Sequence, residues 1–192
     1  MKTSIDRPTP KERILTTVNR LFYEQGYLAT GINQIITEAQ VAKASFYQYF
    51  PSKEDLVLEY LTTYNTNFFK ELKLIEQQFD EPKARILALF DSLADFSLAA
   101  ECRGCAVMNI AVEFSDPHSK PRQLIIQYKQ ELKTFIEQLV LQSMPDNNSP
   151  KLARTKATAV YLLYEAALIE SRVHQDIWSV ETSKAIVNHL LS

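Results

Sequence analysis

Two cysteines are the first residues in this 192-residue chain whose type and spacing could support chemistry. Cys102 and Cys105 are separated by Arg103 and Gly104. A Cys-x-x-Cys spacing can form a disulfide, bind a metal ion or hold a thiol of low pKa, and an adjacent arginine and a nearby helix start both stabilise a thiolate. A metal site needs about four ligands, and the three histidines form no spaced pair that would complete one. We therefore expect no metal, and the cysteines are either inert, pocket-lining residues or thiol sensors.

Sequence patterns of common enzyme sites are missing. The three glycines, Gly26, Gly31 and Gly104, provide no phosphate loop, dinucleotide-binding fingerprint or nucleophile elbow, because each of these needs two or more glycines at fixed spacing. The chain also has no His-Glu-x-x-His or Ser-x-x-Lys motif and no pair of carboxylates at a suggestive spacing. We therefore expect neither an enzyme nor a bound cofactor.

The charges are distributed unevenly, although the net charge is only −2. Residues 1–53 hold seven Lys/Arg and four Asp/Glu, whereas residues 54–192 hold fourteen and nineteen. A basic front on an acidic body suggests that only the front meets a polyanion. The sequence starts without the apolar run of a signal peptide, and no apolar stretch approaches the roughly 18 residues of a membrane span, so we expect a cytoplasmic protein that binds no membrane.

The spacing of the apolar residues predicts an all-α fold. Apolar residues recur at a period near 3.6, and nowhere do they alternate with polar residues as in a strand. Thr9-Pro10-Lys11-Glu12 and Ser52-Lys53-Glu54-Asp55 are capping signatures that begin two of the helices. We expect about nine helices, in the ranges 10–25, 32–39, 43–49, 53–78, 82–99, 104–115, 121–143, 151–175 and 181–191.

The short helix expected at 43–49 has an unusual outer face. With Val41, Phe46 and Phe50 directed inward, the residues left outside are Lys43, Ala44, Ser45, Tyr47, Gln48 and Tyr49. This set is suited to hydrogen bonds with phosphates and base edges, and two short helices joined by a tight turn are the geometry of a helix-turn-helix. The alternative is that Tyr47 and Tyr49 are half-buried against the fourth helix.

The segment from Gly26 to Leu56 reads GYLATGINQIITEAQVAKASFYQYFPSKEDL. It resembles the DNA-binding domain of the TetR family of transcriptional regulators, and the similarity spans roughly residues 10–62. The resemblance implies a helix-turn-helix domain at 1–53, linked by the fourth helix to a helical effector-binding and dimerisation domain at 54–192. Double-stranded DNA is then the polyanion.

The resemblance also implies roles for single residues. Tyr47 and Lys53 would reach DNA phosphates, Asn33 a base or phosphate, and Thr30 a phosphate, while the residues facing base edges would be Lys43, Ala44, Ser45 and Tyr49. Lys53 could instead be only a solvated residue at a helix start. One departure from the family pattern is Gln40, which stands where a turn glycine is usual and must accept a strained conformation if the turn keeps its shape.

The acidic half carries many aromatic residues, and the resemblance implies that a pocket there binds a small-molecule effector. The residues that could line or anchor this pocket are Tyr64, Phe68, Phe90, Met108, Asn109, Glu113, Tyr128, Tyr161, Tyr164 and Glu165. The alternative for each of them is plain core packing. The effector itself is unknown.

The last two helices are expected to form a homodimer. Residues 157–168 are apolar nearly all round, and a helix that is apolar on every side is buried on every side. Together with the resemblance, this predicts a homodimeric regulator, most simply a repressor, that binds a pseudo-palindromic operator and is released by an effector. The alternative keeps the fold and makes Cys105, with or without Cys102, a thiol sensor of oxidants or electrophiles.

Overall fold

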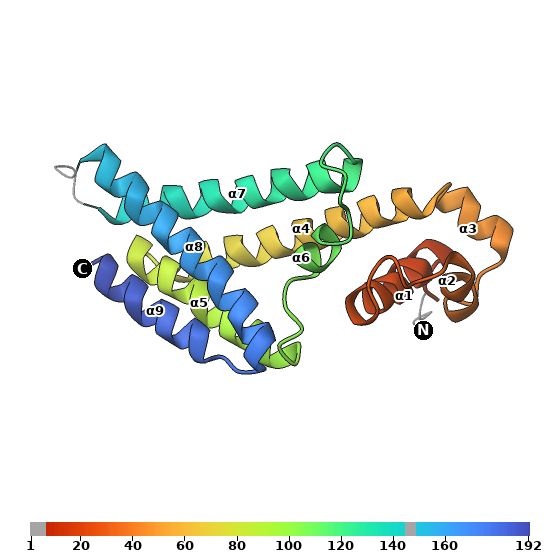
Figure 1. Ribbon diagram of the computed structural model, residues 1–192, viewed down its shortest axis with the longest axis horizontal. Coiled ribbons are helices and arrows are strands. Elements are labelled where there is room, and N and C mark those ends of the chain that lie inside the picture. Colours follow the sequence, from red (N-terminus) through yellow and green to blue (C-terminus); the bar gives the residue numbers. More distant parts are fainter. Residues whose placement is uncertain (1–6, 145–148) are drawn as a thin grey trace, which may run out of the picture. The chain divides into compact units, whose positions relative to one another are not determined.

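The computed structural model describes residues 7–144 and 149–192, and within these ranges it is all-α (Figure 1). The described residues contain nine helices and no strand, as the sequence predicts. The helices are α1 (Pro10–Glu24), α2 (Ile32–Glu38), α3 (Lys43–Tyr49), α4 (Lys53–Gln78), α5 (Pro82–Ala99), α6 (Ala106–Ala111), α7 (Lys120–Ser143), α8 (Pro150–His174) and α9 (Trp178–Leu190). None of these helices is long and apolar enough to cross a membrane.

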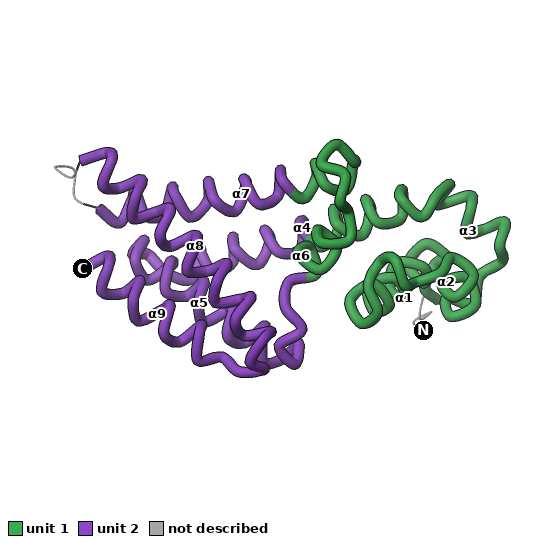
Figure 2. Tube along the Cα trace, in the orientation of Figure 1, with its two compact units in different colours: residues 1–64, 106–125 green, residues 65–105, 126–192 purple. Residues whose placement is uncertain are grey.

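The chain divides into two compact units (Figure 2). Unit 1 comprises Met1–Tyr64 and Ala106–Ile125, and unit 2 comprises Asn65–Cys105 and Ile126–Ser192. The helices α4 and α7 therefore contribute residues to both units. Unit 1 includes α6 in addition to the N-terminal helices. The boundary at 53/54 separates the expected DNA-binding domain from the expected effector-binding domain, and it stays a prediction.

In unit 1, α1 forms because its first turn is capped and one face is apolar. The Thr9 hydroxyl accepts from the Glu12 N–H at 3.3 Å, and the Glu12 carboxylate accepts from the Thr9 N–H at 2.7 Å. This reciprocal pair satisfies N–H groups that have no partner within the helix. The buried face consists of Ile14, Val18, Leu21 and Phe22, and the helix ends before Gly26, which has φ +88°.

The core of unit 2 lies among α5, α8 and α9, which run beside one another (Figure 1). Ile86, Leu89 and Phe90 of α5 are buried here together with Ile136 of α7 and Val160 of α8. The Ser179 hydroxyl at the start of α9 donates to the Ala167 carbonyl of α8 at 2.9 Å, so this buried hydroxyl between the two helices is satisfied.

The sixth helix is shorter than the expected 104–115. It covers Ala106–Ala111, and the chain then tightens because the Glu113 N–H donates to the Ile110 carbonyl, three residues back, at 3.0 Å. The Ala111 carbonyl accepts from the Arg122 guanidinium at 2.8 Å instead of from a further helical turn. A side chain from α7 therefore ends this helix.

Candidate DNA interface

The turn between α2 and α3 sets the direction of α3. Gln40 in this turn has φ 53°, the left-handed conformation that the sequence analysis expects if the turn keeps its usual shape. The Val41 N–H donates to the Ile36 carbonyl at 3.2 Å and the Gln40 N–H to the Thr37 carbonyl at 3.2 Å, which closes the end of α2. The turn thus keeps its geometry without a glycine.

The helix α3 is anchored by one buried aromatic residue and presents polar residues to solvent. Phe46 is fully buried and Phe50 is 3% exposed, as predicted. Lys43, Ala44 and Gln48 are exposed, and Ser45 is half-buried.

The two tyrosines of α3 keep about equal exposure, 41% for Tyr47 and 40% for Tyr49. The Tyr47 ring meets the Phe46 ring edge-on at 5.3 Å between centroids. Both side chains are thus partly supported and partly in solvent. The face that remains outside is the one predicted from the sequence.

The two candidate residues near α2 differ in their surroundings. Asn33 in the first turn of α2 is exposed. Thr30 is fully buried, and its hydroxyl donates to the Gly26 carbonyl at 2.7 Å. A hydroxyl that is buried and already bound cannot meet a phosphate, so the prediction for Thr30 is wrong in this structure; its role is to fix the turn between α1 and α2.

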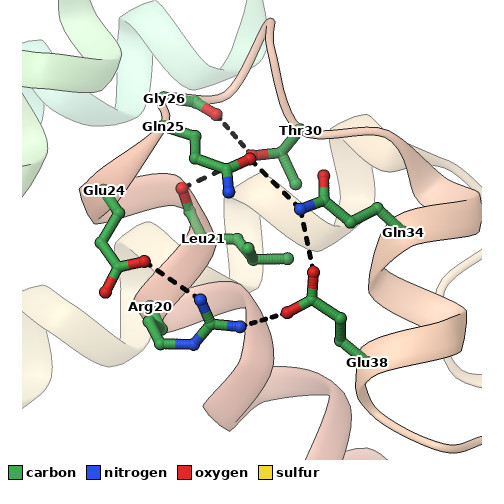
Figure 3. Close-up of polar contacts among 8 residues, drawn as sticks. All are labelled: Arg20, Leu21, Glu24, Gln25, Gly26, Thr30, Gln34 and Glu38. Carbon is green, nitrogen blue, oxygen red and sulfur yellow. Dashed lines mark hydrogen bonds and ion pairs between the residues drawn. The ribbon is translucent and has the colours of Figure 1, made fainter.

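A network of polar side chains joins α1 to α2 (Figure 3). The Arg20 guanidinium donates to Glu24 at 3.0 Å and also to Glu38. The Gln34 amide donates to Glu38 at 2.9 Å and to Gln25 at 3.3 Å. The bond from Gln34, followed by the one from Arg20, lowers the pKa of the Glu38 carboxyl. These residues were not predicted, although the i,i+4 spacing of Arg20 with Glu24 and of Gln34 with Glu38 is visible in the sequence.

Lys53 begins α4 and lies over an aromatic ring. The helix is capped by Ser52, whose hydroxyl accepts from the Asp55 N–H at 3.0 Å and donates to the Asp55 carboxylate at 2.7 Å. The Lys53 ammonium is 4.2 Å from the centroid of the Tyr27 ring, a cation–π contact. Partial burial lowers the pKa of Lys53, and the charge of Glu113 opposes that shift.

Glu113, predicted as an effector anchor, has a different place. Its carboxylate accepts the backbone N–H of Tyr27 at 2.9 Å and that of Leu28 at 2.5 Å, so it holds the turn after α1. Four pocket candidates, Tyr64, Met108, Asn109 and Glu113, belong to unit 1, and the others belong to unit 2. In this structure the Glu113 carboxylate is therefore engaged by the backbone of unit 1, and its role as an effector anchor stays a prediction.

Three pocket candidates of unit 2, Tyr161, Tyr164 and Glu165, lie near a lysine. The Lys129 ammonium contacts the Glu165 carboxylate at 2.7 Å, and both side chains are largely buried. Burial lowers the pKa of Lys129, but electrostatic interactions with Cys105 and Glu165 outweigh that effect, so the pKa is raised. Burial, and then electrostatic interactions with Cys105 and Glu165, raise the pKa of Tyr164. We call Cys105, Lys129, Tyr161, Tyr164 and Glu165 the Lys129 cluster.

The remaining candidates of unit 2 are mostly packed in its core. Phe90 is fully buried, its ring lies 5.7 Å from that of Tyr164, and Tyr128 is 8% exposed. Phe68 is partly buried and packs against the core. Phe90 also lines an open groove of about 470 Å³ between α5 and α9. Both cysteines are free thiols, Cys102 buried and Cys105 half-buried, and no group of three potential metal ligands occurs among the described residues.

Comparison with known proteins bears on the helices of unit 1. Residues 14–60 match the family described as bacterial regulatory proteins, tetR family. Over these residues the chain is similar to the TetR family of transcriptional regulators. The matched residues include most of α1, all of α2 and α3, and the start of α4.

Three relatives show how far the likeness extends. The uncharacterized regulator YxaF of Bacillus subtilis is 42% identical over 84 residues, which are 43% of this chain and only 42% of that protein. The repressor NemR of Escherichia coli is 22% identical over 95% of this chain and 94% of its own, and the crystal structure of its reduced form has a TM-score of 0.80. The regulator SCO4454 of Streptomyces coelicolor has a TM-score of 0.87 at 24% identity, covering 95% of this chain and 94% of that chain.

Proposed function

We propose that this chain is a TetR-family regulator, a homodimeric repressor that binds a pseudo-palindromic DNA operator through α3 and is released by a small-molecule effector. The observation that carries the proposal is the solvent-exposed face of α3. Lys43, Tyr47 and Tyr49 are exposed on this helix, and the buried Phe46 anchors it. A helix of this width fits the major groove, and a dimer reads two half-sites about one helical turn apart.

The residues of the interface have different proposed roles. Lys43, Ala44, Ser45 and Tyr49 face base edges, Tyr47 and Lys53 reach phosphates, and Asn33 reaches a base or a phosphate. Phosphate contacts fix the position of the protein, whereas base contacts carry the sequence preference.

The experiment is a binding titration on duplexes that wild-type protein selects from a random-sequence library. Tyr47→Phe and Lys53→Ala should weaken binding to all duplexes by a similar factor, because phosphates are common to every sequence. Lys43→Ala should in addition change which base pairs are preferred. The same relative loss for all three variants on every duplex would refute these roles.

The homodimer is proposed to form through α8 and α9. Leu162 and Ile169 of α8 are 57% and 50% exposed, and Trp178 and Ile186 of α9 are 45% and 47% exposed. An open, mainly apolar groove of about 590 Å³ runs along α8 beside Leu162 and is lined also by Thr158 and Ala159. Apolar patches of this kind commonly mark interfaces.

The effector is proposed to bind within residues 54–192. The aromatic residues Phe68, Phe90, Tyr128, Tyr161 and Tyr164 in unit 2 give the apolar surroundings that small-molecule sites use. A thermal-shift screen of small lipophilic compounds tests this, since a ligand that binds the native state raises its melting midpoint. A compound that raises the midpoint should also weaken DNA binding.

A thiol sensor is the second candidate, and the Lys129 cluster favours it. Cys105 is a half-buried free thiol near the Lys129 ammonium, and reactive cysteines occur in partly exposed, electropositive surroundings. The test compares release from DNA by N-ethylmaleimide in wild-type protein, Cys105→Ser and Cys102→Ser. Release that persists in Cys105→Ser removes the idea, and release lost in both variants assigns the response to the pair.

A further inference from the structure

Lys53, the residue proposed to meet a DNA phosphate, already lies beside an internal anion. Its ammonium rests over the Tyr27 ring at 4.2 Å from the centroid. The backbone N–H of that same tyrosine donates to the Glu113 carboxylate at 2.9 Å. The Glu113 charge acts on the Lys53 ammonium, since it raises the pKa of Lys53 and so opposes the lowering that burial causes. The Lys53 ammonium is thus attracted by an internal carboxylate with which it forms no ion pair within 4 Å, and it is available to an external phosphate.

Several contacts within unit 1 hold the Glu113 carboxylate in this place. It accepts a second backbone N–H, from Leu28, and the neighbouring Phe114 ring lies 4.9 Å from the Tyr27 ring. Gly26 leaves room for the approach, because a Cβ there would stand 2.7 Å from Glu113 Oε1. The carboxylate is therefore positioned by two backbone hydrogen bonds and an aromatic contact.

We propose that Glu113 restrains DNA affinity by competing with a DNA phosphate for the Lys53 ammonium. The inference rests on the proposed DNA-binding function. A lysine whose charge a nearby carboxylate already stabilises gains less from a phosphate and displaces fewer counterions from DNA. The same carboxylate also repels the phosphate. Glu113 is thus a positioning residue for DNA binding.

The main test is Glu113→Gln, which keeps the shape of the side chain and one carbonyl acceptor but removes the charge. The Kd is measured against salt concentration on a duplex selected by wild-type protein. We expect about three- to tenfold tighter binding near physiological salt. The slope of log Kd against log salt concentration should become steeper by up to about 0.9 per half-site, the contribution of one lysine–phosphate contact. Lys53→Met should cost at least about threefold more affinity in the Glu113→Gln protein than in wild type.

Asp116→Asn is the matched control. Asp116 is exposed on the same connection after α6, and its removal takes away one negative charge without freeing Lys53. Its salt dependence should equal that of wild type. Circular dichroism shows whether each variant is folded, and Lys53→Met in the wild-type background supplies a measurement that leaves Glu113 intact. That variant should lower the salt dependence by clearly less than about 0.9 per half-site.

Three results would overturn the proposal. They are an unchanged or weaker salt dependence in folded Glu113→Gln, equal losses from Lys53→Met in both backgrounds, and a full loss of about 0.9 per half-site from Lys53→Met alone. The first would mean that Glu113 serves only to hold the turn. A wild-type protein that selects no duplex at all would instead contradict the proposed function, so the two failures are distinguishable.

Discussion

At the scale of single residues, Gln40 shows how a turn can impose a conformation that its residue does not favour. Its φ of 53° lies in the left-handed region, where a Cβ crowds the following carbonyl. The backbone bonds of Gln40 and Val41 to α2 hold the turn closed despite this strain. The geometry of α3 therefore comes at a cost in stability.

Gln40→Gly should relieve that strain and stabilise the protein. The left-handed conformation costs a non-glycine residue about 1–2 kcal/mol, and a glycine loses about 0.5–1 kcal/mol more on folding than alanine, so the net gain is about 0.5–1 kcal/mol. Urea unfolding followed by circular dichroism at fixed protein concentration measures it. Gln40→Ala keeps the Cβ and is the control without a gain. A glycine variant no more stable than the alanine variant would show that the turn stores no strain.

Residue type alone did not reveal what Thr30 and Glu113 do. Both are polar, and polar residues next to a helix-turn-helix or within a candidate pocket are reasonably expected to meet a ligand. Thr30 is instead buried and bound to the Gly26 carbonyl. Glu113 binds backbone groups more than 80 residues earlier in the chain. Such distant pairing has no local sequence signal. The inward Phe46, in contrast, follows from local periodicity, and the strain at Gln40 follows from the turn glycine that the resemblance leads one to expect there.

At the scale of elements, helix boundaries with local signals were predicted well. The proline at the start of α5 and the capping residues before α1 and α4 mark positions that agree with the structure. The end of α6 has no such signal, because it depends on the Arg122 guanidinium that takes the Ala111 carbonyl. The start of α9 was also missed, at Trp178 instead of 181, although the Asp176 carboxylate that accepts the Trp178 N–H is local in the sequence.

The capping box of α1 leads to a pH-dependent prediction. Hydrogen bonds from the Thr9 backbone and side chain lower the pKa of Glu12 below its ordinary value. A carboxylate with a lowered folded-state pKa contributes stability that is present above its unfolded pKa and lost as the pH falls through the folded value. Glu12→Gln should therefore be less stable than wild type at pH 7, with a difference that shrinks at pH values below the ordinary glutamate pKa.

Urea unfolding of wild type and Glu12→Gln, at pH 7 and at a pH below the ordinary glutamate pKa, measures the difference in the free energy of unfolding. The control is the same substitution in a Thr9→Ala protein, where the box is already broken and the effect of pH on the difference should be small. A Glu12→Gln penalty that is as large at the acidic pH as at pH 7 would mean that the ionised carboxylate contributes nothing to the cap.

At the scale of the whole molecule, the two compact units change how the acidic half is understood. Residues 106–125 follow the cysteine loop in sequence but belong to unit 1, where Glu113 binds the turn after α1. The sequence assigns this segment to the effector domain because it lies between helices of that domain. The segment is thus covalently flanked by unit 2 and packed in unit 1.

Dimerisation supplies the last prediction, made for Leu162→Glu. Leu162 is 57% exposed on α8, between the buried Val160 and Tyr164, so a charge there is tolerated by a single chain but is costly in an apolar interface. We expect sedimentation to show a monomer, and DNA affinity to fall by about 100-fold or more, because the two half-sites are no longer bound by one particle. Leu98→Glu is the matched control: Leu98 is 59% exposed on α5, outside the proposed interface, so this variant should sediment as the wild type does. A Leu162→Glu protein that stays dimeric and binds DNA normally would place the interface elsewhere.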